Sequence, residues 1–125
     1  MTHSSMKKFI LLFTVTLLMM SCGEQYKAKG VVKDFLKENL TSTDYSTQHF
    51  SDVDSTRNVT PEQVAALRKM AGEWKVFKKE ISYHAYEQRD ALKFTRMMLR
   101  VNDDTLQCTF YLDKELKQVV AFKAY

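Results

Sequence analysis

The side chains best suited to nucleophilic, acid–base or metal chemistry are two cysteines and three histidines among 125 residues. Cys108 alternates with Leu106, Phe110 and Leu112, which predicts a strand whose apolar face packs into the core. A thiol in apolar surroundings has a raised pKa and little access to solvent. We therefore expect Cys108 to be a core residue and not a nucleophile.

Neither His49 nor His84 has a metal-binding or catalytic partner close by in the sequence. His49 has no His, Cys or acid at metal-ligand spacing. A general base needs a second group within hydrogen-bond reach, and no motif near His84 supplies one, although spatial pairing with Cys108 stays open. The chain has no Gly-rich phosphate loop and no Gly-x-Ser-x-Gly elbow. We predict no catalytic residue, metal site or cofactor, and favour a non-enzymatic protein over an enzyme.

Alternating apolar and basic side chains between residues 92 and 101 are a candidate docking surface. In a strand, every second residue lies on the same face, and arginine and aromatic residues often dominate binding energies. Hairpin pairing would add two residues from the face of the following strand that does not carry Cys108. The alternative, which we favour, is that long Arg stems only cover their apolar neighbours. The candidate binding face consists of Phe94, Arg96, Met98, Arg100, Thr109 and Tyr111.

Two helices are expected to pack on the strand face that carries Cys108. Apolar residues at helical spacing over residues 25–40 predict the first helix. Thr60, Pro61 and Gln63 have the pattern of an N-cap, a first-turn proline and a capping box, which predicts a second helix that ends at Gly72. The stripe that this second helix buries is expected to contain Val64, Leu67, Met70 and Ala71.

Four segments have the composition and alternation of strands. Residues 41–58 between the helices are rich in Ser, Thr and Asp, and are expected to run as an extended linker. Two helices packed on a four-stranded antiparallel meander make an α+β domain. The predicted strands lie in Trp74–Tyr86, Leu92–Val101, Leu106–Leu112 and Lys117–Tyr125.

Residues 6–22 have the order of a secretory signal: Lys7 and Lys8, an apolar run to Met20, and a small residue before Cys22. The run is shorter than the ~20 apolar residues of a membrane-spanning helix. It resembles a bacterial lipoprotein signal with the lipobox Met19-Met20-Ser21-Cys22. This resemblance implies a diacylglycerol on the Cys22 thiol, cleavage before it and acylation, for example with palmitate. The alternatives are an ordinary secretory signal or a buried helix beside a coincidental cysteine.

Cleavage there would divide the chain into a signal peptide (1–21), a lipidated tether (22–25) and a single α+β domain (26–125). Lipidation would leave Cys108 without an intramolecular disulfide partner. Two of the 19 Lys and Arg residues lie in the signal, so 17 basic side chains remain against 15 acidic ones. Nucleic-acid binding would require a larger basic excess, and we predict no nucleic-acid partner.

The chain contains the short motifs Asp44-Tyr45-Ser46, Phe50-Ser51-Asp52-Val53-Asp54, Phe110-Tyr111-Leu112-Asp113 and Val119-Val120. In these motifs it resembles small lipoproteins of Bacteroidota over most of residues 31–123. The layout is also similar to cystatin-like and NTF2-like domains, which serve as enzymes, inhibitors and binding modules. In such a bacterium, Asp54-Ser55-Thr56 resembles a short O-glycosylation pattern, which implies modification of Ser55.

We expect an envelope lipoprotein that is held at the membrane by its lipid and binds an envelope protein or a small ligand. Gly23 is not the Asp that retains some enterobacterial lipoproteins at the inner membrane, which favours the outer membrane. The alternative is a small-pocket enzyme or ligand carrier of the NTF2-like kind. A purely structural envelope component is a third hypothesis.

Overall fold

The computed structural model describes residues 23–83, 85, 86 and 91–125. The predicted signal, Cys22 and His84 lie outside this range. The described residues form two helices and a five-stranded open antiparallel sheet, which confirms the α+β class. A helix over residues 23–39, here called the N-terminal helix, comes first. It is followed by β1 (Tyr45–Gln48), β2 (Asp54–Thr56), α2 (Pro61–Gly72), β3 (Leu92–Val101), β4 (Asp104–Leu112) and β5 (Val119–Ala124).

Strand β3 is the centre of the sheet, and the strand order is β1-β3-β4-β5. On one side β3 pairs with β4. On its other side β1 pairs with the second half of β3, and β2 pairs with its first three residues. Ser51 continues this ladder between the two short strands: its N–H donates to the Arg96 carbonyl and its Oγ accepts from the Arg96 N–H, both at 2.8 Å. The polar segment 41–58 therefore forms one edge of the sheet.

The predicted strand over Trp74–Tyr86 is wrong, because its described residues form no strand. Phe77 makes a single antiparallel bridge to Leu40, at the end of the N-terminal helix. The ring of Phe77 also lies 4.7 Å from that of Phe122, so this segment packs over the core. The edge of β3 that the predicted strand would have used is occupied by β1 and β2.

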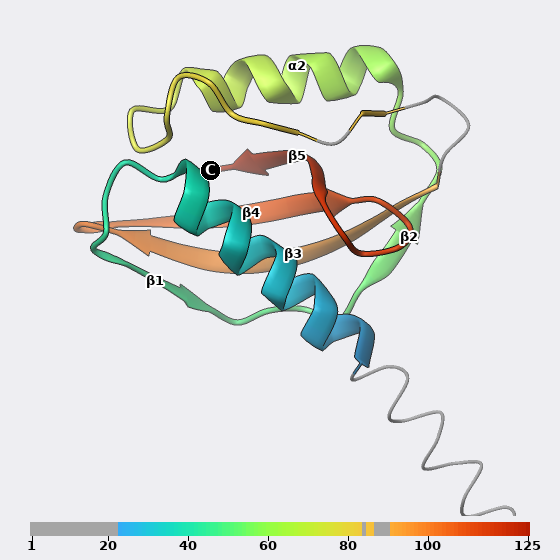
Figure 1. The fold of residues 1–125 in the computed structure, drawn as a ribbon, viewed down its shortest axis with the longest axis horizontal. Coiled ribbons are helices and arrows are strands. Elements are labelled where there is room, and N and C mark those ends of the chain that lie inside the picture. Colours follow the sequence, from blue (N-terminus) through green and yellow to red (C-terminus); the bar gives the residue numbers. More distant parts are fainter. Residues whose placement is uncertain (1–22, 84, 87–90) are drawn as a thin grey trace, which may run out of the picture.

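The N-terminal helix lies across one face of the sheet (Figure 1). We call this the covered face. The Phe35 ring meets those of Phe110 and Phe122 edge-on, with centroids 5.9 and 5.5 Å away, and the last two stack at 5.1 Å. This apolar layer is the main core. The sheet residues of the covered face include Met97, Leu99, Val101, Cys108, Phe110 and Phe122.

Helix α2 lies along β5, at the edge of the sheet opposite β1 (Figure 1). The predicted capping box is confirmed: Thr60 accepts from the Gln63 N–H, and the Gln63 side chain accepts from the Thr60 N–H. Arg68 Nε donates to the Val120 carbonyl at 2.9 Å. By satisfying an edge carbonyl and covering β5, α2 protects this edge from pairing with another chain.

The prediction that α2 packs on the face that carries Cys108 is wrong for the first half of the helix. Val64 clusters with Leu92, Val120 and Ala121 on the other side of the sheet, whereas Ala71 belongs to the main core. Because α2 straddles the β5 edge in this way, it buries only a narrow stripe. Val64 and Ala71 are buried, as predicted, whereas Met70 is 54% exposed and its predicted burial is wrong. The helix ends with Glu73 in right-handed helical geometry at the C-cap. Gly72 is therefore the last helical residue, and no left-handed glycine cap is needed.

The sequence predicts an extended tether over residues 22–25, but residues 23–25 are helical. Both polar side chains of this turn have partners on the sheet side. Glu24 forms an ion pair with Lys93 at 2.7 Å, and Gln25 Nε2 donates to the Phe50 carbonyl at 3.1 Å. These contacts hold the first described turn against the domain. A free tether would not make them.

Candidate functional site

The second face of the sheet carries the predicted binding residues, and we call it the open face. In the β3–β4 register Phe94 lies opposite Tyr111 and Arg96 lies opposite Thr109. Their side chains therefore point the opposite way from Met97, Cys108 and the rest of the covered face. Arg96 and Arg100 are exposed, while Phe94, Met98 and Tyr111 are half-buried. The expected alternation of side chains between the two faces of β3 and β4 thus holds, but α2 packs against the open-face side at Ala121 and Tyr111.

Apolar and basic groups contact each other on the open face. The rings of Phe94 and Tyr111 are 6.1 Å apart, and the Arg96 guanidinium lies 5.7 Å from the centroid of the Phe94 ring. This cation–π geometry holds the Arg96 stem along the aromatic pair. The Arg96 stem therefore covers Phe94, as the alternative interpretation expects, and the side chain as a whole stays exposed. The docking surface stays a prediction.

Thr109 differs from the other predicted residues because it is only 3% exposed. It lies between Arg96 on β3 and Lys123 on β5, each directly opposite it in register. Thr109 is thus buried between two long basic side chains and does not itself offer a contact surface. Lys123 was missed in the prediction, although its alternation with the buried Phe122 and Ala124 is the signal that places it on the open face.

The charge of the open face is predominantly positive. Arg96, Arg100 and Lys123 lie on its strands, and Asp54 of β2 is the acid in register with Phe94. Neither Arg96 nor Arg100 forms an ion pair with any residue in the described ranges. Two guanidinium groups are therefore available to an external carboxylate.

Cys108 is buried in the covered face, as predicted, and is a free thiol. Burial raises its pKa from 9.0 to about 12. At neutral pH the thiol is therefore protonated, which removes its use as a nucleophile. His49 is exposed after β1, with a left-handed backbone (φ 58°), and Ser55 is exposed in β2. His84 lies outside the described residues, so its pairing with Cys108 stays open.

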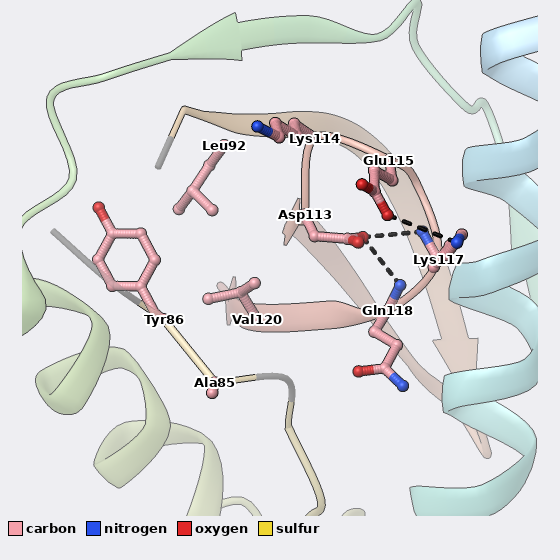
Figure 2. A pocket seen from close by; sticks show the side chains of 9 residues that line it. All are labelled: Ala85, Tyr86, Leu92, Asp113, Lys114, Glu115, Lys117, Gln118 and Val120. Atoms are coloured by element: carbon pink, nitrogen blue, oxygen red, sulfur yellow. Dashed lines mark hydrogen bonds and ion pairs between the residues drawn. The ribbon is translucent and has the colours of Figure 1, made fainter. Parts of the chain in front are cut away.

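A depression of ≈300 Å³ lies beside the β4–β5 turn (Figure 2). Its polar groups serve the turn: Asp113 Oδ1 accepts from the backbone N–H of Lys117 at 2.8 Å and of Gln118 at 3.0 Å. Lys117 also lies 3.5 Å from Glu115. Since the carboxylate of Asp113 is used to fix the backbone, this hollow does not have the converging free polar groups of an active site.

A second hollow of ≈320 Å³ lies between the N-terminal helix and Tyr83. The Tyr83 hydroxyl is buried without a hydrogen-bond partner among the described residues. Burial raises the pKa of Tyr83 to about 12, an effect that the nearby positive charge of Arg68 opposes. Asp34 and Glu38 of the helix line the same hollow. A buried phenol without a partner is unusual, and it is the feature that favours a small ligand here.

Within the described ranges, no group of three His, Cys, Asp or Glu side chains could hold a metal ion. Neither helix there is long and apolar enough to cross a bilayer. Comparison with known protein families, curated proteins and solved structures finds no match for this chain. The similarity to cystatin-like and NTF2-like layouts therefore stays a prediction.

Proposed function

We propose that this chain is a lipid-anchored, non-enzymatic interaction module of the bacterial cell envelope, which binds an acidic protein partner through the open face. The proposal rests on the exposure and the lack of ion pairing of Arg96 and Arg100. Both are exposed, lie on the same strand face and have no ion pair within the described residues. Half-buried Phe94, Met98 and Tyr111 surround them with apolar surface.

The spacing of the two arginines specifies the partner further. They are four positions apart on one strand, which corresponds to ~13 Å between their Cα atoms. A guanidinium binds a carboxylate most strongly through two parallel hydrogen bonds. The partner therefore presents two acidic groups about one such strand interval apart, with an apolar side chain between them that meets Met98. This combination of arginine and apolar contacts is typical of residues that dominate an interface.

The lipid anchor is supported by the signal-like order of residues 6–22 and by Cys22 at its end. A diacylglycerol on Cys22 would hold the domain at the membrane surface, and Gly23 favours the outer membrane. Replacement of Cys22 by Ala is expected to abolish acylation and release the protein from the membrane fraction, because two or three acyl chains outweigh any protein contact. Cys22→Ala protein that is still labelled by palmitate and still sediments with membranes would overturn the lipoprotein proposal.

The binding face is tested with a double variant, Arg96→Ala with Arg100→Ala. Its matched control is Lys33→Ala with Lys37→Ala, which removes the same charge from exposed positions of the N-terminal helix. Chemical cross-linking in intact cells, followed by purification, is expected to yield a defined protein adduct with wild type and the control but not with the arginine variant. Equal adduct yields from two folded variants would contradict the proposed face.

The second candidate function, a carrier of a small ligand, is favoured by the partnerless Tyr83 hydroxyl beside a hollow. In this case native mass spectrometry of protein released gently from membranes would find a small molecule on the wild type. Tyr83→Phe removes only the hydroxyl and would lower its occupancy. Protein that is ligand-free under these conditions contradicts the carrier function and leaves the first proposal in place.

A further inference from the structure

A shallow groove of ≈530 Å³ lies between the first described turns of the N-terminal helix and the end of β1. The helix contributes Gln25, Tyr26 and Lys29, and the other wall includes Gln48, His49 and Phe50. Two contacts join the helix to Phe50. Gln25 Nε2 donates to the Phe50 carbonyl, and the Lys29 ammonium lies 5.5 Å from the centroid of the Phe50 ring.

The groove differs from the hollows beside the β4–β5 turn and Tyr83 in its charge. No carboxylate lines it within the described part of the chain, whereas Asp and Glu line the other two. Lys29 lines it, whereas exposed Lys27, two residues earlier in the same helix, faces another way and does not line it. Glu24, the nearest acid of the helix, is neutralised by its 2.7 Å ion pair with Lys93. The charge of the groove therefore suits an anionic group.

Tyr26 adds the second feature. It is 81% exposed and is the most exposed of the large hydrophobic side chains of the structure's described residues. A tyrosine that is not packed on its own protein is a preferred side chain at the headgroup level of a membrane, and lysine stems reach to the same level. An exposed Tyr26 at a groove without acidic side chains is suited to contact a membrane surface.

The place of the groove relative to Cys22 identifies its occupant. The N-terminal helix enters the molecule at the periphery, at the lower right of Figure 1. Tyr26 follows Cys22 by four residues, so the two backbones are within ~14 Å of each other however the link runs. A lipid on Cys22 would therefore place the groove against the leaflet that holds it.

We infer that the groove of Tyr26, Lys29 and His49 binds the headgroups of anionic phospholipids in the leaflet that carries the lipid anchor, and so fixes the orientation of the domain. This inference rests on the proposed lipid anchor. The N-terminal helix runs from Lys93, at the start of β3, toward Asn102, which accepts from the Ser42 hydroxyl beyond the end of β3. The strands thus lead away from the bilayer, and the open face stands at its side, accessible to a second envelope protein.

The test uses the full, processed and acylated chain in vesicles of phosphatidylethanolamine and phosphatidylglycerol. A fluorescent label is placed at Gly30→Cys, an exposed position next to Lys29 where a side chain meets nothing within 4 Å, or, at the far end of the sheet, at Asp103→Cys. The buried Cys108 does not compete for the label. A nitroxide on lipid headgroups is expected to quench the label at residue 30 several-fold more than the label at residue 103. Equal quenching at the two positions would overturn the inference.

The charge dependence is tested in the Gly30→Cys background. Lys29→Gln is expected to lower the quenching in anionic vesicles to the level found with phosphatidylcholine alone. The matched control is Lys78→Gln, because the Lys78 N–H bonds the Asn39 carbonyl at the other end of the helix. This control is expected to keep the quenching. In ~1 M salt, where the Debye length is about 3 Å, the quenching should also fall. Quenching that is independent of Lys29 and of lipid charge would contradict headgroup binding.

The two proposals fail in different ways. Absence of acylation in the processed chain contradicts the lipid anchor and with it the orientation inferred here. An acylated, vesicle-bound protein with an unquenched label at residue 30 contradicts the groove alone and leaves the anchor in place.

Discussion

The two faces of the sheet use neighbouring residues of the same strands in opposite ways. On β4, Phe110 is fully buried against Phe35 and Phe122, while the next residue, Tyr111, is half-buried beside Phe94 on the open face. On β3, buried Met97 and Leu99 alternate with exposed Arg96 and Arg100. A strand with period two can thus supply a core and a contact surface at once. The difference predicts that substitutions cost stability on the covered face and binding on the open face.

The largest expected effect is that of Phe110→Ala on the covered face. The ring is 0% exposed and stacks on Phe122 at 5.1 Å. Its removal leaves a cavity that the surrounding rings fill only in part, so we expect a loss of about 3–5 kcal/mol in the free energy of unfolding. Urea denaturation of the folded domain measures this loss. A cost below that of a surface change would show that the N-terminal helix does not seal this face.

Cys108→Ala should cost roughly 1 kcal/mol or somewhat more, because it removes a small buried side chain. The same residue predicts a pH dependence. Its folded-state pKa is raised to about 12 from 9.0, so the unfolded chain releases the thiol proton first and stability falls as the pH rises from 9.0 toward 12. Tyr83, whose pKa is also raised, acts in the same direction. The alanine variant should lose less stability over this range than wild type, as measured by urea midpoints; an identical slope would contradict the burial of Cys108.

Phe94→Ala on the open face should cost less than either change. Its ring is half-buried and its ring contact with Tyr111 is a cross-strand pair at 6.1 Å. Such pairs contribute roughly 0.2–1 kcal/mol. Chemical denaturation of the Phe94→Ala and Phe110→Ala variants compares the free energy of unfolding that each face loses. If both phenylalanines cost the same, the open face is part of the core.

The smallest expected effect on folding is that of Arg96→Ala with Arg100→Ala. Both side chains are exposed, and substitutions at such positions usually change stability by no more than about 0.5 kcal/mol. Arg96 also loses its cation–π contact with Phe94, but Phe94→Ala removes the same contact together with the aromatic pair, so the arginine variant remains the smaller change. The thermal midpoint should therefore shift only slightly. A cooperative loss of structure would mean that the arginines are structural and that any loss of binding is indirect.

The sequence predicted best where a pattern is local. The alternation of β3 and β4 correctly separated Arg96 from Met97, and Thr60 with Gln63 correctly located the start of α2. The sequence predicted poorly where pairing is decided between distant segments. Residues 74–86 have strand-like composition, but the polar β1 and β2 occupy the edge of β3 instead.

The groove of Tyr26, Lys29 and His49 could not be predicted from local patterns, because its walls come from separate parts of the chain. The contact between Gln25 and the Phe50 carbonyl joins residues 25 positions apart. The same contact explains why residues 23–25 are helical and not an extended tether. Hydrophobic periodicity reports which side of an element is buried, but not which distant segment will lie beside it.

The central claim, that the open face binds an acidic partner, is tested most directly by site-specific photo-cross-linking in intact cells. A photoreactive residue at Gln107, which is exposed and opposite Met98 in register, reports on the open face, and one at Lys33 reports on the helix side. We predict a discrete protein adduct from position 107 that disappears when Arg96 and Arg100 are changed to Glu, and no such adduct from position 33. An adduct that forms from position 33 alone, or one from position 107 that persists after charge reversal, would contradict the claim.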